Sequence, residues 1–484
     1  MKYLFYLLMG IFLPLNVMAQ ALNVTDFGAV GDGKTDNTEA VQKAIDEASR
    51  KNTTLVFPTG TFMTGMIHLK SNVTIELQSG SVWQAVPDLK LFPEIPSNAD
   101  LSQSGGYTMS RRAFIFGDNL ENVTLTGDGT IYPSGDHHEA FPMHEKNGSK
   151  RPYGIYFRNC QNITVRDLTL TNSAFWMLRT YLCDNVRIHN IELFNHANTN
   201  NDGMDIVDCH RVHISDCTVD SADDGICLKT EAPKGTEDVV ITNCIVSSTA
   251  SYIKLGTGSF GTFKRITVSN CVLRPTRATK IVHGLGYRNG ITGLSLMSVD
   301  GCDIENISFN NIVMDGMMTP IFIRLSDRHK VTHTEYNDHP ITAGTIKNIS
   351  YSNITATNIG SVPVNITGYP ENYVEGVSMH NCKFEYNTAG TVKDLTIEVP
   401  ENSKNYPYPK MYGTDLPASG IYFRHVKNII FDQVQIAPAE GDPRPAIHFD
   451  DVINYRGENV LVDYQDIKKK QFVIKNSGKL KAGI

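Results

Sequence analysis

A short alternating motif recurs along most of the chain and constrains the fold more than any other feature. Each copy starts with a polar residue and continues with alternating β-branched and polar residues, as in Asn162-Ile-Thr-Val and Asn348-Ile-Ser-Tyr. Such alternation is typical of a strand with one face buried. The copies begin at Asn122, Asn162, Asn185, Arg211, Asp238, Arg265, Asn306, Asn348 and Asn428.

The spacing of the copies predicts how these strands are arranged. The five copies from Asn162 to Arg265 begin 23, 26, 27 and 27 residues apart, and no helical period lies between them. Parallel sheets with helical crossovers and antiparallel sandwiches are therefore disfavoured. We predict an all-β fold, a right-handed parallel β-helix whose coils stack about 4.8 Å apart. The gaps of 41 and 42 residues after Arg265 and Asn306 predict loop insertions that line a groove.

Both ends of the chain differ from the repeat. Lys2, an apolar run over residues 3–15 and Ala19 before Gln20 are typical of a secretory signal peptide, predicted at residues 1–19. We therefore expect an exported protein, periplasmic or secreted, and no membrane span. Residues 20–455 are predicted to form one β-helical catalytic domain, and residues 456–484 a C-terminal cap or tail.

The open N-terminal end of a β-helix needs a cover, because its strand edge would otherwise pair with other chains. Asp36 and Glu39 have the spacing of a capping box, which predicts the start of a short capping helix. One face of this helix carries Val41, Ala44, Ile45 and Ala48. We expect that face to pack with residues 55–57 and close the first coil.

Charge and cysteine content exclude some classes of protein. The chain has 44 Lys and Arg against 51 Asp and Glu, a net charge of −7, and no long basic run. This argues against nucleic acid as a partner. The nine cysteines contain no Cys-x-x-Cys pair and lie beside Val- or Ile-rich strands. We interpret them as buried core residues, with one or two disulfides as the alternative.

Three aspartates form the most informative cluster. Asp202 and Asp224 are 22 residues apart, close to one coil, so that a β-helix would place them side by side on adjacent turns. Asp223 joins them if the backbone bends there. We expect one pKa to rise and the other two groups to stay ionised, the division between acid and base that glycosidic hydrolysis requires. The alternative is that Asp-Gly and Asp-Asp-Gly are ordinary turns.

Several motifs resemble glycoside hydrolase family 28, the polygalacturonase family, whose enzymes are right-handed β-helices. Residues 26–45 match the start common to this family and related pectin-active β-helices, and Asn172-Ser-Ala-Phe-Trp176 matches a second family segment. Asn200-Asn-Asp202-Gly-Met-Asp205 and the Asp223-Asp224 pair match its acidic motifs. The resemblance covers about residues 22–315.

The resemblance implies a role for each aspartate. Asp223 would be the general acid that protonates the leaving oxygen, while Asp202 and Asp224 would hold and activate water. The family inverts anomeric configuration without a covalent intermediate. We further predict that the substrate is bound by Asn200, Lys229, Lys254, Arg288 and Arg324.

Two departures from the family pattern bear on the substrate. The family's Gly-His-Gly is replaced by Ala250-Ser251-Tyr252, and its Arg-Ile-Lys, which grips a galacturonate carboxylate, by Ser295-Leu-Met297. Without Arg and Lys this clamp has no charge-assisted bonds. A neutral sugar such as rhamnose beside the cleaved bond would tolerate the change, and rhamnogalacturonan-active members also depart from the histidine motif. His283 is one candidate to replace the histidine.

The favoured function is an exported glycoside hydrolase that acts on a pectic polysaccharide or oligosaccharide containing galacturonic acid, with rhamnogalacturonan as one candidate. A calcium-dependent polysaccharide lyase and a non-catalytic carbohydrate-binding β-helix are the alternatives. Retention of all three aspartates favours the hydrolase over both. We expect a monomer with no metal and no cofactor, and the sequence leaves both endo and exo action open.

Overall fold

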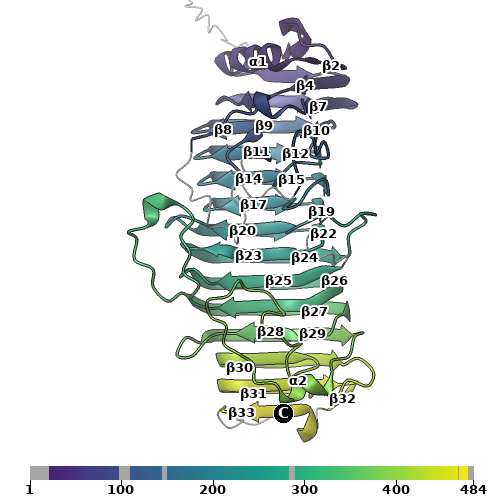
Figure 1. Cartoon of the computed structure of the whole chain (residues 1–484), viewed down its shortest axis with the longest axis vertical. Coiled ribbons are helices and arrows are strands. Elements are labelled where there is room, and N and C mark those ends of the chain that lie inside the picture. Colours follow the sequence, from purple (N-terminus) through teal and green to yellow (C-terminus); the bar gives the residue numbers. More distant parts are fainter. Residues whose placement is uncertain (1–20, 97–109, 144–149, 283–288, 467, 478–484) are drawn as a thin grey trace, which may run out of the picture.

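The computed structural model describes residues 21–96, 110–143, 150–282, 289–466 and 468–477, and shows a tall stack of short strands (Figure 1). Strands of successive coils pair in parallel. This is the right-handed parallel β-helix predicted from the repeat.

The first coils contain β1 (Leu22–Asn23), β2 (Asp32–Asp36), β3 (Thr54–Phe57), β4 (Gly60–Thr64), β5 (Ile67–His68), β6 (Val73–Leu77), β7 (Ser81–Ala85), β8 (Ala113–Asp118), β9 (Glu121–Gly127) and β10 (Thr130–Tyr132). The middle coils contain β11 (Tyr153–Arg158), β12 (Gln161–Arg166), β13 (Thr169–Thr171), β14 (Leu178–Tyr181), β15 (Asp184–His189), β16 (Glu192–Asn195), β17 (Met204–Val207), β18 (His210–Ser215), β19 (Thr218–Ser221), β20 (Ile226–Thr230), β21 (Thr236–Thr242) and β22 (Ile245–Ser248).

The last coils contain β23 (Ser251–Ser259), β24 (Thr262–Arg274), β25 (Gly290–Ser298), β26 (Asp303–Leu325), β27 (Thr345–Ile359), β28 (Val364–Thr367), β29 (Val374–Tyr386), β30 (Ile421–Ala437), β31 (Ile447–Val462), β32 (Gln465–Asp466) and β33 (Phe472–Lys475). The helices are α1 (Thr38–Lys51) and α2 (Val392–Thr396), and four 3-10 turns cover Val24–Phe27, Leu89–Leu91, Thr334–Tyr336 and Lys469–Gln471.

The recurring Asn of the repeat stands at a bend of each coil. Asn122, Asn162 and Asn185 have φ of 58°, 58° and 55°, the left-handed region that Asn tolerates better than most residues. Their side chains also join the coils: the amide of Asn162 donates to Asn122 Oδ1 at 2.9 Å, and that of Asn185 to Asn162 Oδ1 at 3.0 Å. The repeat position therefore combines a backbone requirement with a hydrogen-bonded ladder.

Aliphatic ladders fill the interior of the solenoid. Ile163, Val186, Val212 and Val239 are paired in register on successive coils and are completely buried. All nine cysteines are buried and free, which agrees with their interpretation as core residues. No helix among the described residues is long and apolar enough to cross a membrane.

Helix α1 covers the N-terminal end of the stack (Figure 1). Its face of Val41, Ala44, Ile45 and Ala48 is buried as predicted. The predicted capping box is wrong: Asn37 is the N-cap residue, its side chain makes no capping hydrogen bond, and Asp36 belongs to β2. Asp36 instead accepts the backbone N–H of Thr38 at 3.0 Å. The signal peptide predicted at residues 1–19 lies outside the described residues.

The C-terminal end continues the solenoid. β31 (Ile447–Val462) runs across residue 455, and β33 (Phe472–Lys475) pairs with it in parallel. The division into a domain ending at residue 455 and a cap or tail stays a prediction.

Two long connections lie against the outward face of the stack. Residues 326–344, between β26 and β27, form the green protrusion at the left of Figure 1. Residues 387–420, between β29 and β30, contain α2 and hydrogen-bond with the first connection, since Asp327 N donates to Ser403 O at 3.3 Å. The loop insertion predicted after Asn306 is therefore present.

Candidate active site

The register of the coils brings the aspartates together. β17 and β20 pair with Met204 opposite Ile226, so that Asp202 and Asp224, two residues earlier on each coil, are neighbours. Gly203 N donates to Asp224 O at 2.9 Å, which fixes this alignment. Asp223 stands in the turn before β20, and its backbone N–H donates to Asn201 O at 3.3 Å. The three carboxyl groups share one face, where Asp202 and Asp224 are buried and Asp223 is partly exposed.

The glycines that follow two of the aspartates are required by the close approach of the coils. A Cβ atom on Gly203 would lie 2.5 Å from Gly225 O, and one on Gly225 would lie 2.6 Å from both Tyr252 O and Val246 Cγ1. Real Cβ atoms do not approach backbone this closely. The Asp-Gly pairs are therefore packing requirements of the stacked turns that carry the carboxyl groups.

Gly225→Ala is expected to destabilise the fold by about 1–3 kcal/mol, the usual cost of overpacking, and to lower turnover by shifting Asp224. Urea unfolding and kcat measure the two effects. Gly258→Ala is the matched control, because a Cβ atom there would meet its neighbours at 3.5 Å or more. Equal stability of the two variants would contradict the packing argument.

Two buried lysines are paired with the aspartates. Lys229 Nζ lies 3.3 Å from Asp202 Oδ2 and also contacts Asp205 Oδ1. Lys254 Nζ lies 2.7 Å from Asp224 Oδ2. These ion pairs are screened little by solvent, because both lysines are less than a tenth exposed.

The three aspartates differ in the direction of their pKa shift: the pKa is raised at Asp202 and Asp223 and lowered at Asp224. Burial, and then the charge of Asp224, raise the pKa of Asp223 to about 7. Burial likewise raises the pKa of Asp202, with Asp223 as the second cause. Burial acts in the same direction on Asp224, but Lys254 and Lys229 lower the pKa of that carboxyl below its ordinary value.

The expectation that a single pKa rises therefore differs from the structure, in which two rise. The reason is that Lys229 is shared between Asp202 and Asp205, so burial outweighs it at both, and the pKa of Asp205 is raised as well. Asp224 is the member of the cluster whose pKa is lowered, which favours its ionised form.

The predicted substrate ligands fall into different surroundings. Asn200 lies at the site: its amide donates to Asp223 Oδ2 at 3.3 Å, and its Oδ1 accepts from buried Arg151 at 3.1 Å. Lys229 and Lys254 lie at the site as well, with their ammonium groups directed to the aspartates. Arg288 and the candidate His283 lie outside the described residues.

Arg324 does not fit its predicted role as a sugar ligand. Its side chain is 1% exposed and donates to Gly368 O at 2.9 Å and to Glu401 O at 2.6 Å. Its position in β26 faces away from the interior, but Glu401 and Tyr412, from the connection between β29 and β30, contact it there. Arg324 therefore anchors this connection.

A buried network beside the aspartates was not predicted. Arg179, opposite Asp205 in the register of β14 and β17, lies 2.8 Å from Glu231 Oε2 and donates to the hydroxyl of Tyr153 at 2.6 Å. His333, from the connection between β26 and β27, lies 3.1 Å from the same Glu231 oxygen. The register position of Arg179, one coil before Asp205, was the available signal for this residue, whereas nothing local indicated its partners.

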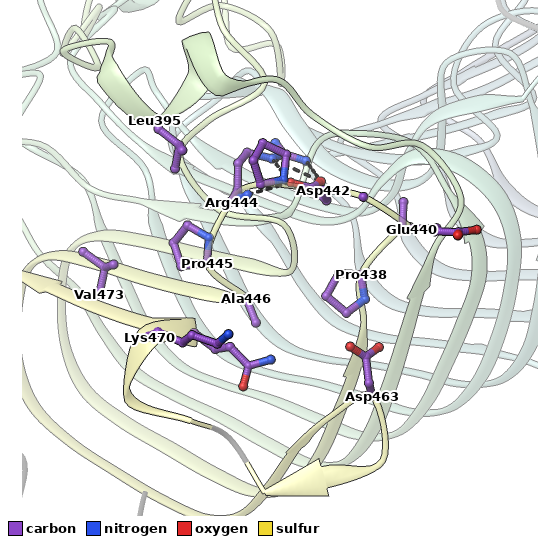
Figure 2. A pocket seen from close by; sticks show the side chains of 14 residues that line it. Leu395, Pro438, Glu440, Asp442, Arg444, Pro445, Ala446, Asp463, Lys470 and Val473 are labelled. Carbon is purple, nitrogen blue, oxygen red and sulfur yellow. Dashed lines mark hydrogen bonds and ion pairs between the residues drawn. The ribbon is translucent and has the colours of Figure 1, made fainter.

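A hollow of about 750 Å³ lies elsewhere, near the C-terminal end (Figure 2). Its lining includes Leu395 of α2, Lys470, and an ion pair between Arg444 and Asp442 at 2.7 Å. Arg444 also donates to the carbonyls of Asp415 and Leu416. The arginine therefore joins loops to the end of the stack and is not available to a ligand.

Comparison with known proteins assigns the family. The sequence profile of Glycosyl hydrolases family 28 matches residues 48–404. The chain belongs to glycosyl hydrolase family 28. It is therefore a glycoside hydrolase, as predicted.

Individual family 28 relatives agree with this assignment. A probable polygalacturonase of Vitis vinifera is 26% identical over 414 residues, which cover 81% of this chain and 77% of the relative. The exopolygalacturonase of Thermotoga maritima superposes with a TM-score of 0.61 at 23% identity, over 76% of this chain and 87% of that one. The family 28 exopolygalacturonase of Yersinia enterocolitica gives a TM-score of 0.60 at 16% identity, over 96% and 78%. The two structures share the fold.

The register locates the positions at which the chain departs from the family 28 pattern. Ser251 is on the coil directly after Asp224, and its backbone N–H donates to Asp224 Oδ1 at 3.3 Å. Ser295 stands opposite Lys254, and Met297 opposite Arg324. The positions where the family pattern has His, Arg and Lys therefore carry neutral side chains. Ser295 lies two coils after Asp224 and is buried, and Met297 is buried against Val299 and Phe322.

Proposed function

We propose that the protein hydrolyses glycosidic bonds in a pectic polysaccharide or oligosaccharide that contains galacturonic acid. The observation that carries the proposal is that two neighbouring carboxyl groups of a family 28 β-helix have pKa values shifted in opposite directions, raised at Asp223 and lowered at Asp224. The relatives named above are polygalacturonases, which supports galacturonic acid as part of the substrate.

We assign the roles from the electrostatics of the site. Asp223, with a pKa raised to about 7, keeps its proton in mildly acidic solution and is the general acid for the leaving oxygen. Asp224, with its lowered pKa, is the base that takes a proton from water, and Asp202 holds that water with it. Lys254 Nζ and Ser251 N each contact one oxygen of Asp224, which restrains its orientation. We propose inversion on the basis of the family 28 assignment.

The substrate carries a neutral sugar beside the cleaved bond in this proposal. Ser295 and Met297 align with the Arg and Lys that grip a carboxylate in the family motif, so a uronate bound in that way would lose its charge-assisted bonds. Rhamnogalacturonan has the required alternation of neutral and acidic sugars. We further propose export, on the basis of the signal peptide predicted at residues 1–19.

The function is tested by incubating the protein with homogalacturonan and with rhamnogalacturonan and measuring new reducing ends. We expect reducing ends to form faster from rhamnogalacturonan, and proton NMR to show an inverted anomer as the first product. New reducing ends from homogalacturonan and none from rhamnogalacturonan would overturn the proposal that a neutral sugar lies beside the cleaved bond. Binding of both polymers without any new reducing ends would indicate a carbohydrate-binding β-helix.

The same assay separates the hydrolase from a calcium-dependent lyase. A lyase would form an unsaturated product that absorbs in the ultraviolet, and a chelator would stop it. We expect no absorbance change and no effect of chelator, because Lys229 and Lys254 Nζ already lie against the carboxylates where a cation would bind. Calcium-dependent growth of the ultraviolet absorbance would show that the protein is a lyase and would contradict the proposed hydrolase.

A further inference from the structure

We propose that Lys254 is a positioning residue, which keeps Asp224 ionised and correctly oriented. The inference rests on the proposed role of Asp224 as the base. It changes the role predicted for Lys254, from a ligand of the substrate to a residue that acts through Asp224.

The position of Lys254 in the stack directs its side chain to Asp224. Asp205, Cys227, Lys254 and Ser295 occupy one outward ladder on four successive coils. From this ladder the lysine side chain reaches back one coil, so that Nζ lies 2.7 Å from Asp224 Oδ2. The side chains of the pair are 7% and 6% exposed, which leaves the ammonium group little access to a sugar.

Strand β23 holds both oxygens of Asp224. Lys254 Nζ contacts Oδ2, while the backbone N–H of Ser251, at the start of the same strand, donates to Oδ1 at 3.3 Å. A carboxylate held at both oxygens by one rigid strand has a fixed orientation. The serine thus contributes through its backbone, and the lysine provides the positive charge.

The other charges around Asp224 leave Lys254 as its direct counter-ion. A buried carboxylate without a cation takes up a proton. Lys229 contacts Asp202 and Asp205 at short range, so Lys254 is the cation in direct contact with Asp224 among the described residues. Several titratable groups face this ion pair from the neighbouring elements: Asp202 and Asp223 from the turns before β17 and β20, Asp205 from β17, Cys227 and Lys229 from β20, and Tyr406 from the connection between β29 and β30.

The test compares Lys254→Met and Lys254→Arg in pH profiles of kcat/KM on the substrate that the wild type cleaves. Without the lysine, the pKa of Asp224 rises, so the acidic limb of the profile moves to higher pH. A shift of one to two pH units lowers kcat/KM about 10- to 100-fold on that limb, with recovery toward neutral pH. Lys254→Arg keeps the charge and leaves the limb near its wild-type position. Lys264→Met is the matched control, a lysine 3.8 Å from Glu305 on the surface of β24.

A raised KM in both variants, with the acidic limb unmoved, would overturn the proposal in favour of a substrate ligand. A loss of stability with the limb unmoved would overturn it in favour of a structural role.

A second measurement needs no substrate and so separates this inference from the proposed function. In Lys254→Met the buried Asp224 must carry a proton to remain in the fold, so the difference in melting temperature from the wild type should widen as pH rises from 4 to 8. Adding Asp224→Asn should remove this dependence on pH. A difference that is constant with pH would show that Lys254 does not keep Asp224 ionised, whether or not the protein cleaves pectin.

Discussion

Asp223→Asn is expected to lower kcat by about 10²- to 10⁴-fold, the usual contribution of a general acid. An amide cannot protonate the leaving oxygen, whereas the raised pKa of about 7 keeps the wild-type carboxyl protonated in mildly acidic solution. The substitution preserves size, and the Asn200 contact at 3.3 Å is the one to check for local rearrangement. Reducing-end assays at saturating substrate measure the loss.

The two shifted pKa values also predict how turnover depends on pH. An acid must be protonated to act, so wild-type turnover should fall as pH rises through about 7, the pKa of Asp223. A base must be ionised, so turnover should also fall as pH drops through the lowered pKa of Asp224. In Asp223→Asn the loss at high pH should disappear from the residual activity.

Asp216→Asn is the matched control, because that aspartate is 45% exposed beside His189 and distant from the cluster in the register. Its kcat should equal that of the wild type. An Asp223→Asn enzyme with kcat within tenfold of the wild type would contradict the role of Asp223 as the acid.

Arg179→Met is expected to destabilise the fold by about 3–5 kcal/mol, the usual cost of leaving one charge of a buried ion pair without its partner. Arg179 and Glu231 are each 4% exposed and lie 2.8 Å apart. Burial acts to raise the pKa of Glu231, but Arg179 and His333 lower it to about 2. Chemical denaturation of the two proteins at several pH values measures the difference.

The dependence on pH follows from the lowered pKa. In the wild type, stability from ionised Glu231 is present above the unfolded pKa of about 4.3 and is lost as pH falls toward 2. In Arg179→Met the glutamate is protonated in the fold, so the difference between the proteins should shrink as pH falls from 7 to 3.

Two further variants test the cause. Arg179→Met/Glu231→Gln should recover part of the loss, because no unpaired charge then remains buried. Arg456→Met removes an arginine that is 66% exposed beside Glu458, and should change the free energy of unfolding by less than about 1 kcal/mol. If Arg179→Met lowers the free energy of unfolding no more than Arg456→Met does, the buried pair of Arg179 and Glu231 contributes little to stability.

Much of the site could be predicted because coil length determines which residues become neighbours. The 22 residues between Asp202 and Asp224 make one coil, and the paired strands β17 and β20 align them as expected. The same logic placed Ser251 on the next coil. The capping box predicted for α1 is absent. Asn37 takes the N-cap position, and its side chain accepts from the N–H and donates to the C=O of Val30 instead of capping the helix.

The roles of the cations could not be predicted in this way. Lys254 stands one coil after Asp224 whether its ammonium group points to a sugar or back to the carboxylate. Arg324 has an outward strand position, and only the path of residues 397–416 over it decides that it is buried.

The sequence by itself determined the solenoid, the stacking of its coils and the meeting of three aspartates, because alternation and repeat length are local properties that determine strand register. The tertiary structure alone decided which carboxyl groups pair with lysine and which keep a proton. Those pairings depend on side-chain direction and on segments such as the one that carries His333, 102 residues from Glu231. Burial and charge act over a few ångströms in space, whereas the sequence orders residues only along the chain.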